Sequence, residues 1–240
     1  MKEKDIDKHA FPYQPPTKLI REKYANFFSH PEVVTTPICK RCFDILFSSF
    51  VLVPGIAILL ALKLFLLFES LVKPSSRGPL LYFYWGVSQG ERFKKWKIRI
   101  IQTSRIDQNL ALNNEWAAYK NEWDPKARTW TGAIAKKFYL DEIPQFISVL
   151  KGDMSFVGPR PLSVEHFEKD AEQGNITRKM LKGGVLGLGH IHKGTARMGD
   201  PEFEYEYLQI INEGRCKTIL ATDFMIIFKG LRLVAKGQGL

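Results

Sequence analysis

The chain has 240 residues, enough for one hydrophobic core with appendages, which argues against several independent domains. Its 35 lysines and arginines outnumber its 25 aspartates and glutamates, so the formal net charge is +10. This excess favours a polyanionic partner: nucleic acid, an acidic membrane surface or a phosphorylated substrate. Charge alone does not choose among these three.

The cysteines indicate the compartment. Cys39, Cys42 and Cys216 are an odd number, and the polar, proline-containing residues 1–37 show no cleavable export signal. We therefore expect a reducing, cytoplasmic environment. Cys39 and Cys42 have the C-x-x-C spacing of a zinc knuckle, but the other ligands would be Cys216 and a distant histidine. We favour free thiols over a zinc site.

The clearest feature in chain order is the apolar run "DILFSSFVLVPGIAILLALKLFLLF", residues 44–68. Residues 45–62 carry no charge and as a helix would reach about 27 Å, close to the thickness of the hydrocarbon core of a membrane. Pro54 and Gly55 lie at the centre of the run. Because proline removes a backbone hydrogen bond, we expect a sharp bend there.

Positive charge flanks both ends of the apolar run, at Lys40, Arg41, Lys63, Lys73 and Arg77. A helix that crosses the membrane normally shows this excess on the cytoplasmic side only. We therefore predict a re-entrant helix-break-helix, which enters the membrane and returns to the same face. A full span and a buried soluble helix are the alternatives.

The remaining elements are shorter and predict a helix-rich α+β domain with a small sheet. They are a hairpin of two strands around residues 80–84 and 92–101, joined near residues 86–90, helices at 109–123, 143–150 and 164–173, a glycine-rich loop or tight strand at 183–194, and a helix from about Thr222 to residue 234. The last helix is amphipathic, which suits either the membrane interface or an ordinary core.

Two adjacent acids, Asp141 and Glu142, stand just before Pro144. Because proline is tolerated in the first turn of a helix, a helix should begin close to these carboxylates. Basic residues surround them in sequence, with Lys136 upstream and Arg160 in the loop "GDMSFVGPRP". Carboxylates, a divalent cation and basic residues beside a membrane suit phosphoryl transfer onto a lipid.

The run "LDEIPQFISVLKGDMSFVGPRP" resembles the signature of the bacterial sugar transferases, the monotopic phosphoglycosyl transferases that begin glycan assembly on undecaprenyl phosphate. The resemblance extends from about Lys40 to the C-terminus, through "KRCFDILFSS", Gly78-Pro79, "KKWKIR" and residues 184–187. It implies three parts: a polar N-terminal extension at residues 1–39, a re-entrant membrane helix at 40–72, and a cytoplasmic transferase domain at 73–240.

The resemblance also implies a reaction. A sugar 1-phosphate passes from a nucleotide sugar, usually a UDP-sugar, to undecaprenyl phosphate in the presence of Mg²⁺, and a nucleoside monophosphate is released. Asp141 would be the nucleophile that forms a phosphosugar intermediate. Glu142 would assist it and share the metal, and Lys97 would hold the site together. Residues expected to bind substrate are Arg160, Lys136, Arg99, Pro159 and His190, and Pro54 would break the membrane helix.

The implied location is the bacterial inner membrane with the transferase domain facing the cytoplasm, without nucleic acid as a partner; whether the chain forms a homodimer stays open. Some positions depart from the family pattern, including Lys136 for arginine, Val53 for serine, Gly183 for proline and aromatic residues at 83–88. Because these departures put the substrate in doubt, the alternative is a non-catalytic membrane-surface subunit or scaffold of a glycan assembly complex.

Overall fold

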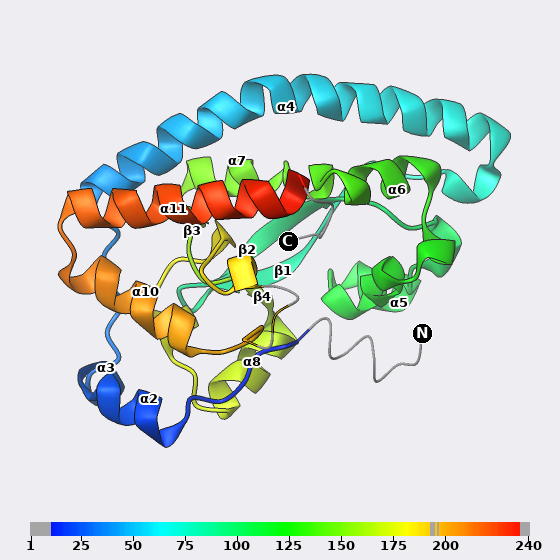
Figure 1. Ribbon diagram of the computed structural model, residues 1–240. Helices are drawn as coiled ribbons and strands as arrows, with labels where there is room; N and C mark the ends of the chain where they lie inside the picture. Colours follow the sequence, from blue (N-terminus) through cyan, green and yellow to red (C-terminus); the bar gives the residue numbers. More distant parts are fainter. Residues whose placement is uncertain (1–10, 193–194, 196, 236–240) are drawn as a thin grey trace.

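The computed structural model describes residues 11–192, 195 and 197–235, apart from the side chains of residues 190, 234 and 235 (Figure 1). The helices are α2 (Lys18–Lys23), α3 (Ala25–Ser29), α4 (Ile38–Val72), α5 (Gln108–Leu112), α6 (Trp130–Lys137), α7 (Gln145–Lys151), α8 (Val164–Glu172), α9 (Thr177–Met180), α10 (Glu202–Glu213) and α11 (Cys216–Ala235). The strands are β1 (Leu81–Ser88), β2 (Glu91–Ile98), β3 (Ser155–Val157), β4 (Leu162–Ser163) and β5 (Gly184–Leu186). The helix-rich α+β class is confirmed.

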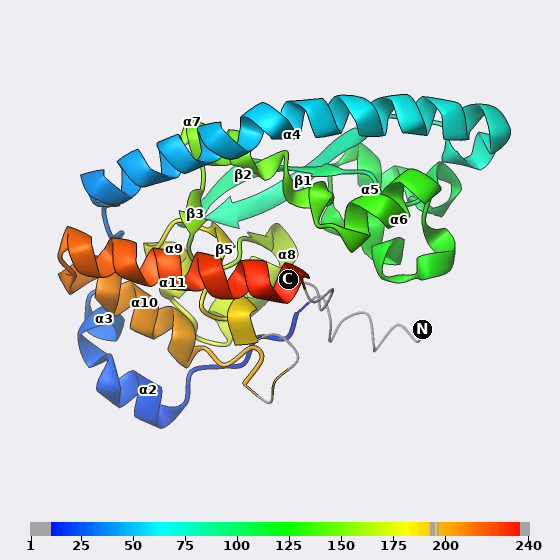
Figure 2. The ribbon, with the colours of Figure 1, turned by 45° about the horizontal axis from the view of Figure 1, so that its top comes forward.

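The long helix α4 arches over one side of the molecule, with α6, α7 and α11 beneath it and α2, α3, α8 and α10 on the opposite side (Figures 1 and 2). It is long and apolar enough to cross a membrane, and only 22% of its most apolar window is buried. The predicted break is wrong, because the helix stays continuous from Ile38 to Val72 with Pro54 inside it. Re-entry into the membrane remains a prediction.

Three charged residues fasten the first turns of α4 to the rest of the fold. Lys40 donates a 2.7 Å hydrogen bond to Asp223 of α11, and Arg41 donates to the carbonyls of Val149 and Leu150 at the end of α7. Asp44 accepts hydrogen bonds from the Ser155 hydroxyl and the Phe156 amide of β3. The sequence "KRCFD" is therefore a set of anchors that holds the exposed helix against the domain.

At its other end, α4 supports the helix that carries Lys136. The buried Glu69 accepts hydrogen bonds from the amides of Trp130 and Thr131 and from the Thr131 hydroxyl. These amides belong to the first turn of α6, whose N–H groups have no partner within the helix. Glu69 thus sets the position of α6 relative to α4.

The main sheet has the strand order β2-β1-β4, and all its pairings are antiparallel. β1 and β2 form the predicted hairpin through Gln89 and Gly90, both of which have positive φ, as a two-residue primed turn requires. Tyr82 pairs with Lys97 and Tyr84 with Lys95. Alternation along β2 therefore turns both lysines to the same, buried face of the sheet.

Several expectations from the sequence need correction. The helix predicted at 109–123 is a short α5 followed by a 3-10 helix at Trp116–Trp123, and α11 begins at Cys216 rather than near Thr222. Cys39 is not a free thiol, because it forms a disulfide with Cys216, whereas Cys42 is free and exposed. The argument from the cysteines for a reducing environment therefore does not hold. Spacing along the chain gave no sign that the starts of α4 and α11 lie side by side.

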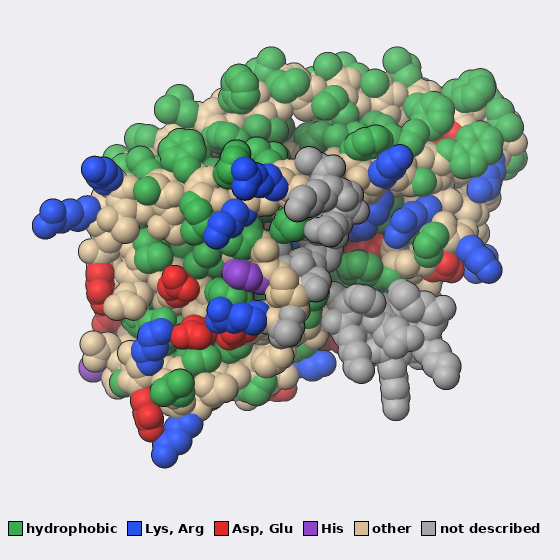
Figure 3. Space-filling view, viewed as in Figure 1, with side chains coloured by type: hydrophobic (Ala, Val, Ile, Leu, Met, Phe, Trp, Pro, Cys, Tyr) green, Lys and Arg blue, Asp and Glu red, His purple; other side chains and the backbone are tan. Residues whose placement is uncertain are grey.

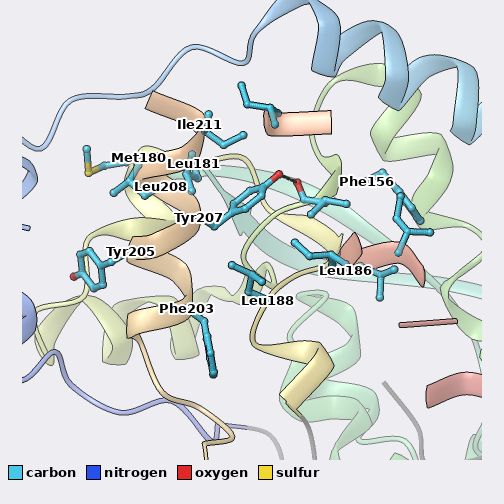
Figure 4. Packing of buried hydrophobic residues seen from close by; sticks show 14 of the residues in the cluster. Phe156, Met180, Leu181, Leu186, Leu188, Phe203, Tyr205, Tyr207, Leu208 and Ile211 are labelled. Carbon is cyan, nitrogen blue, oxygen red and sulfur yellow. Dashed lines mark hydrogen bonds between the residues drawn. The ribbon is translucent and has the colours of Figure 1, made fainter. Parts of the chain in front are cut away.

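The largest core cluster joins α10, α11, β3 and β5, with Tyr207 lying among its aliphatic side chains (Figure 4). The Tyr207 hydroxyl donates a 2.7 Å hydrogen bond to Asp223 and lies 3.2 Å from the Val157 carbonyl. Ile20 and Tyr24 of the N-terminal extension are buried members of the same cluster. The described part of the extension is therefore packed into the body of the domain.

Candidate active site

A tight backbone turn presents the two acids. Tyr139 adopts the left-handed conformation (φ 56°), and Leu140–Glu142 follows as a 3-10 turn. Pro144 then stands immediately before α7, in agreement with the predicted helix start. The turn buries Asp141, which is 1% exposed, and leaves the side chain of Glu142 17% exposed.

Lys97 lies at the centre of the site. Its Nζ is 3.6 Å from Asp141 Oδ2, 3.7 Å from Glu142 Oε1 and 3.5 Å from Glu122 Oε2. The side chain is 3% exposed, so a single buried ammonium faces three carboxylates. In a low-dielectric environment such a charge holds together acids that would otherwise repel one another.

Two more cations complete the cluster. Lys136, at the end of α6, has its Nζ 3.6 Å from Asp141 Oδ2, and Arg160 Nη2 is 3.5 Å from Glu142 Oε1. Both side chains are partly exposed, at 21% and 32%. Asp141 thus lies between two lysines, and Glu142 lies between Lys97 and Arg160.

The loop that carries Arg160 is held by close backbone packing. The Gly158 amide donates to the Leu186 carbonyl at 2.7 Å, and the Gly184 amide donates to the Pro159 carbonyl at 2.8 Å. A Cβ on Gly184 would lie 2.0 Å from the Gly158 nitrogen, so only glycine allows this approach. Lys95 Nζ also donates a 2.9 Å hydrogen bond to the Pro161 carbonyl. These contacts fix the direction of Arg160.

The pKa values of the two neighbouring acids are displaced in opposite directions. Burial raises the pKa of Asp141, and the nearby Lys97 and Lys136 offset this only in part. Burial also acts on Glu142, but Lys97 and Arg160 outweigh it and hold the pKa of Glu142 below its usual value. The environment therefore makes Asp141 the more basic carboxylate of the pair.

A cavity reaches this cluster from the side of β4 and α8. Its lining includes Lys95, Lys97, Glu122 and Arg160, whereas Asp141 and Glu142 are not among the lining residues. The two acids lie directly behind, one ion pair away from Lys97 and Arg160. The lining thus carries basic residues together with the acids Glu122, Asp200 and Glu204, and it adjoins Asp141 and Glu142 through Lys97 and Arg160.

The chemistry of the acids fits a divalent cation shared with a substrate. Neither carboxylate oxygen of the buried Asp141 accepts a hydrogen bond. Among the described residues, no group of three or more histidines, cysteines, aspartates and glutamates is arranged to enclose a metal. Mg²⁺ is commonly held by one or two carboxylates together with substrate phosphates, so Asp141 and Glu142 suit that mode of binding.

The structure brings most of the predicted site residues together. Asp141, Glu142, Lys97, Lys136 and Arg160 form one cluster, and Pro159 lines the cavity beside it. The side chain of His190 lies outside the described residues. Pro54 is in helix α4, and the neighbouring Gly55 lies against Ile143, the residue that follows Glu142.

Arg99 is the exception. It is 1% exposed, and its guanidinium donates hydrogen bonds to the carbonyls of Pro79, Ile101 and Ser76. All three hydrogen bonds are made to main-chain carbonyls near the end of β2. Arg99 therefore supports the backbone and does not join the cluster around Lys97, and a role for it in substrate binding stays a prediction.

Two ionisable members of the site were missed from the sequence. Lys95 precedes Lys97 by two residues, so strand alternation could have placed both on the same face. Glu122 lies in the 3-10 helix at Trp116–Trp123 and reaches Lys97 only through the tertiary fold. No local pattern around Glu122 distinguishes it from a surface acid.

Comparison with known proteins gives a consistent result. Residues 35–237 match the family model described as bacterial sugar transferase. The exopolysaccharide production protein ExoY of Rhizobium meliloti is 30% identical over 213 residues, which cover 84% of this chain and 88% of that protein.

Two longer relatives carry names that specify a reaction. The chain is 31% identical over 209 residues to the UDP-N-acetylgalactosamine-undecaprenyl-phosphate N-acetylgalactosaminephosphotransferase of Aeromonas hydrophila. It is 32% identical over 205 residues to the UDP-glucose:undecaprenyl-phosphate glucose-1-phosphate transferase of Klebsiella pneumoniae. These matches cover 83% and 80% of this chain but only 44% and 40% of the two relatives.

Proposed function

Because the chain belongs to the bacterial sugar transferase family, and is on that ground a phosphoglycosyl transferase, we propose that it transfers a sugar 1-phosphate from a nucleotide sugar to undecaprenyl phosphate. The donor is a UDP-sugar, and the reaction starts the assembly of a polysaccharide. The observation that supports this most directly is the buried Lys97, within 3.7 Å of three carboxylates that include Asp141.

In the first step, an oxygen of Asp141 attacks the phosphorus that carries the sugar. The bond from that phosphorus to the oxygen bridging the two phosphates breaks, and the nucleoside monophosphate leaves with the bonding electron pair. The raised pKa of Asp141, caused by burial, makes this carboxylate a better nucleophile once it is ionised. A covalent phosphosugar on Asp141 results.

In the second step, a phosphate oxygen of undecaprenyl phosphate attacks the same phosphorus. The bond to Asp141 breaks, the carboxylate is restored, and the sugar becomes attached to the lipid through a diphosphate. The covalent route replaces one difficult displacement by two easier ones.

The cations reduce repulsion between the carboxylate and the anionic donor. Arg160 lies along the cavity, where it suits phosphate oxygens, and Lys97 stabilises negative charge that develops on the phosphoryl oxygens. Burial holds the pKa of Lys95 well below its usual value, so Lys95 does not count among these cations. Glu142, ionised because of its low pKa, keeps Arg160 and Lys97 in place. A bound Mg²⁺, held by Asp141 and Glu142, would supply further neutralisation of the diphosphate.

The apolar helix α4 accounts for the lipid acceptor. Its exposed residues suit association with a membrane, and α11 adds exposed Phe224, Phe228 and Leu231 nearby. We place the transferase domain on the cytoplasmic face of the inner membrane, where nucleotide sugars are available. Entry and exit of α4 on that same face agrees with positive charge at both ends of its apolar stretch.

The test is a panel of nucleotide sugars incubated with the full chain, undecaprenyl phosphate and Mg²⁺, with release of nucleoside monophosphate as the measurement. We expect release from at least one UDP-sugar. Omitting the lipid should leave a sugar-phosphate adduct, which mass spectrometry should locate on Asp141. No release from any donor would instead support the non-catalytic subunit.

A further inference from the structure

The N-terminal segment formed by residues 11–16 lies outside the matched family region, residues 35–237, yet it covers part of the cavity. Pro12 and Tyr13 are lining residues. In both views the segment before α2 runs beside α8, on the side of the molecule away from α4 (Figures 1 and 2). This chain therefore builds one side of its cavity from residues that the family region lacks.

The segment is held by defined contacts on both sides of Tyr13. The Gln14 amide donates to the Gly199 carbonyl at 3.0 Å, and Asn175 Nδ2 donates to the Gln14 carbonyl at 3.0 Å. A Cβ on Gly199 would lie 1.9 Å from the Pro12 carbonyl oxygen. Gly199 also has φ +82°, so glycine is required there for two reasons. The close packing of residues 11–16 against Gly199 and Asn175 is thus part of the fold.

Tyr13 is coupled to the site through a buried arginine. The Arg178 guanidinium lies over the Tyr13 ring, 4.1 Å from its centroid, and forms ion pairs with Asp170 and Glu204. Arg178 Nε also donates a 3.1 Å hydrogen bond to the Arg160 carbonyl. One buried side chain therefore positions both the Tyr13 ring and the backbone of Arg160.

The charge of Arg160, the arginine that we expect to face the phosphates, also acts on the hydroxyl of Tyr13. Burial raises the pKa of Tyr13, while the positive charges of Arg178 and Arg160 act in the opposite direction. The phenol therefore stays protonated at neutral pH and can donate a hydrogen bond to a ligand oxygen.

The position of Tyr13 indicates which of the two substrates this residue would contact. The lipid acceptor has to arrive from the membrane, on the side of the exposed helix α4, whereas the segment lies on the opposite, aqueous side (Figure 1). We propose that Tyr13 is a donor-binding residue, which packs its ring and hydroxyl against the nucleotide sugar beside Arg160. This inference rests on the proposed function, because it assumes a nucleotide sugar in the cavity.

The test compares Tyr13→Ala, Tyr13→Phe and Gln14→Ala in the full chain, using the nucleotide sugar that the wild-type protein turns over. Gln14 is the matched control, because its side chain is exposed and its contacts to Gly199 and Asn175 are made by the backbone. We expect Tyr13→Ala to raise the donor KM about tenfold, as loss of an aromatic contact and a hydrogen bond would do. The KM for undecaprenyl phosphate should not change.

Tyr13→Phe should show a smaller rise of the donor KM, and Gln14→Ala should match the wild type. An unchanged donor KM in Tyr13→Ala, with wild-type turnover intact, would overturn the inference and leave the proposed function standing. A lower donor KM or faster turnover would also overturn it, because the segment would then obstruct the cavity. A wild-type protein inactive with every donor would refute the proposed function itself.

A melting temperature for each variant, measured in detergent, separates local effects from misfolding. Parallel rises of the donor and acceptor KM values, together with a lower melting temperature, would show a structural role only and would overturn the assignment of Tyr13 to the donor.

Discussion

Asp141 and Glu142 are neighbours in sequence, yet their surroundings push their pKa values apart. Asp141 is almost fully buried and neither of its oxygens accepts a hydrogen bond, so its charge is poorly solvated. Glu142 faces Lys97 and Arg160 and is stabilised in its ionised form. This difference fits the proposed roles, in which Asp141 attacks the donor and Glu142 keeps Lys97 and Arg160 in place.

Replacing Asp141, the proposed nucleophile, should lower activity while raising stability. We expect Asp141→Asn to lower the transfer rate by at least about a thousandfold. Because the folded-state pKa of Asp141 is raised, its ionised form costs stability at pH values above that pKa. The variant should therefore melt at a higher temperature than the wild type at pH 8.

The difference in melting temperature between Asp141→Asn and the wild type should shrink as the pH falls, since the wild-type carboxyl then becomes protonated and neutral as well. Thermal unfolding followed in detergent at several pH values measures this. Near-normal turnover in the variant would refute the nucleophile assignment.

Lys97 should control the acid side of the pH profile. Its charge lowers the pKa of Asp141, so in Lys97→Met that pKa should rise further and activity should be lost at a higher pH than in the wild type. We expect kcat/KM at neutral pH to fall by about 10²–10³.

Lys97→Arg is the matched control, because it keeps the positive charge. The pH at which kcat/KM falls on the acid side of the profile, its acid limb, should stay close to the wild-type value in this variant. If the acid limb of Lys97→Met coincided with that of the wild type, Lys97 would not be the group that keeps Asp141 ionised.

At the scale of elements, α4 is the least expected feature. Pro54 lies inside a continuous helix, whose N-terminal half is anchored by Lys40, Arg41 and Asp44 and whose C-terminal end is joined to α6 through Glu69. A helix anchored at both ends can accommodate the missing hydrogen bond at proline by curving. Figure 2 shows this arch along its length.

Removing the proline should change how the helix lies in the membrane. In a Cys42→Ser background, a cysteine introduced at Ser75 reports which side of the membrane follows α4. We expect labelling from the cytoplasmic side only, and labelling from both sides after Pro54→Ala, because a straighter helix favours crossing in some molecules. Val53→Ala is the control next to it. Identical labelling with and without Pro54 would show that the curvature has another cause.

At the scale of the whole molecule, exposed apolar side chains gather along α4 (Figure 3). They include Phe50, Val53, Ile56, Leu60 and Leu64, each more than half exposed. Contiguous apolar surface of this extent is unusual on soluble monomers and marks contact with a membrane or another protein. The segment before α2 lies on the opposite side of the molecule from α4 (Figure 1), which fits the proposed division into a membrane side and an aqueous side.

Charges placed on the membrane side should weaken attachment. Each aspartate at Phe50 and Leu60 would cost up to about 3 kcal/mol in the hydrocarbon region. We therefore expect the double variant Phe50→Asp/Leu60→Asp to move in part to the soluble fraction after a high-salt wash. Leu112→Asp is the control, since Leu112 is 81% exposed but belongs to α5, away from α4. Retention of the double variant at the wild-type level would argue that this face does not contact lipid.

The sequence by itself determined the local features of this protein. The apolar run, the β1–β2 hairpin, the start of α7 after Pro144 and the acid pair follow from hydrophobic patterns, turn residues and proline geometry, which act between neighbours in the chain. The family signature around Asp141 also depends only on contiguous residues.

Only the tertiary structure decided which distant residues share the site. Glu122 joins Lys97, Arg99 is withdrawn to support the backbone, Cys39 meets Cys216, and Tyr13 reaches the cavity beside Arg160. These outcomes depend on how the hairpin, α4, α6 and the N-terminal segment pack together. The direction and depth of a side chain are set by that packing, and packing has no period that can be read along the chain.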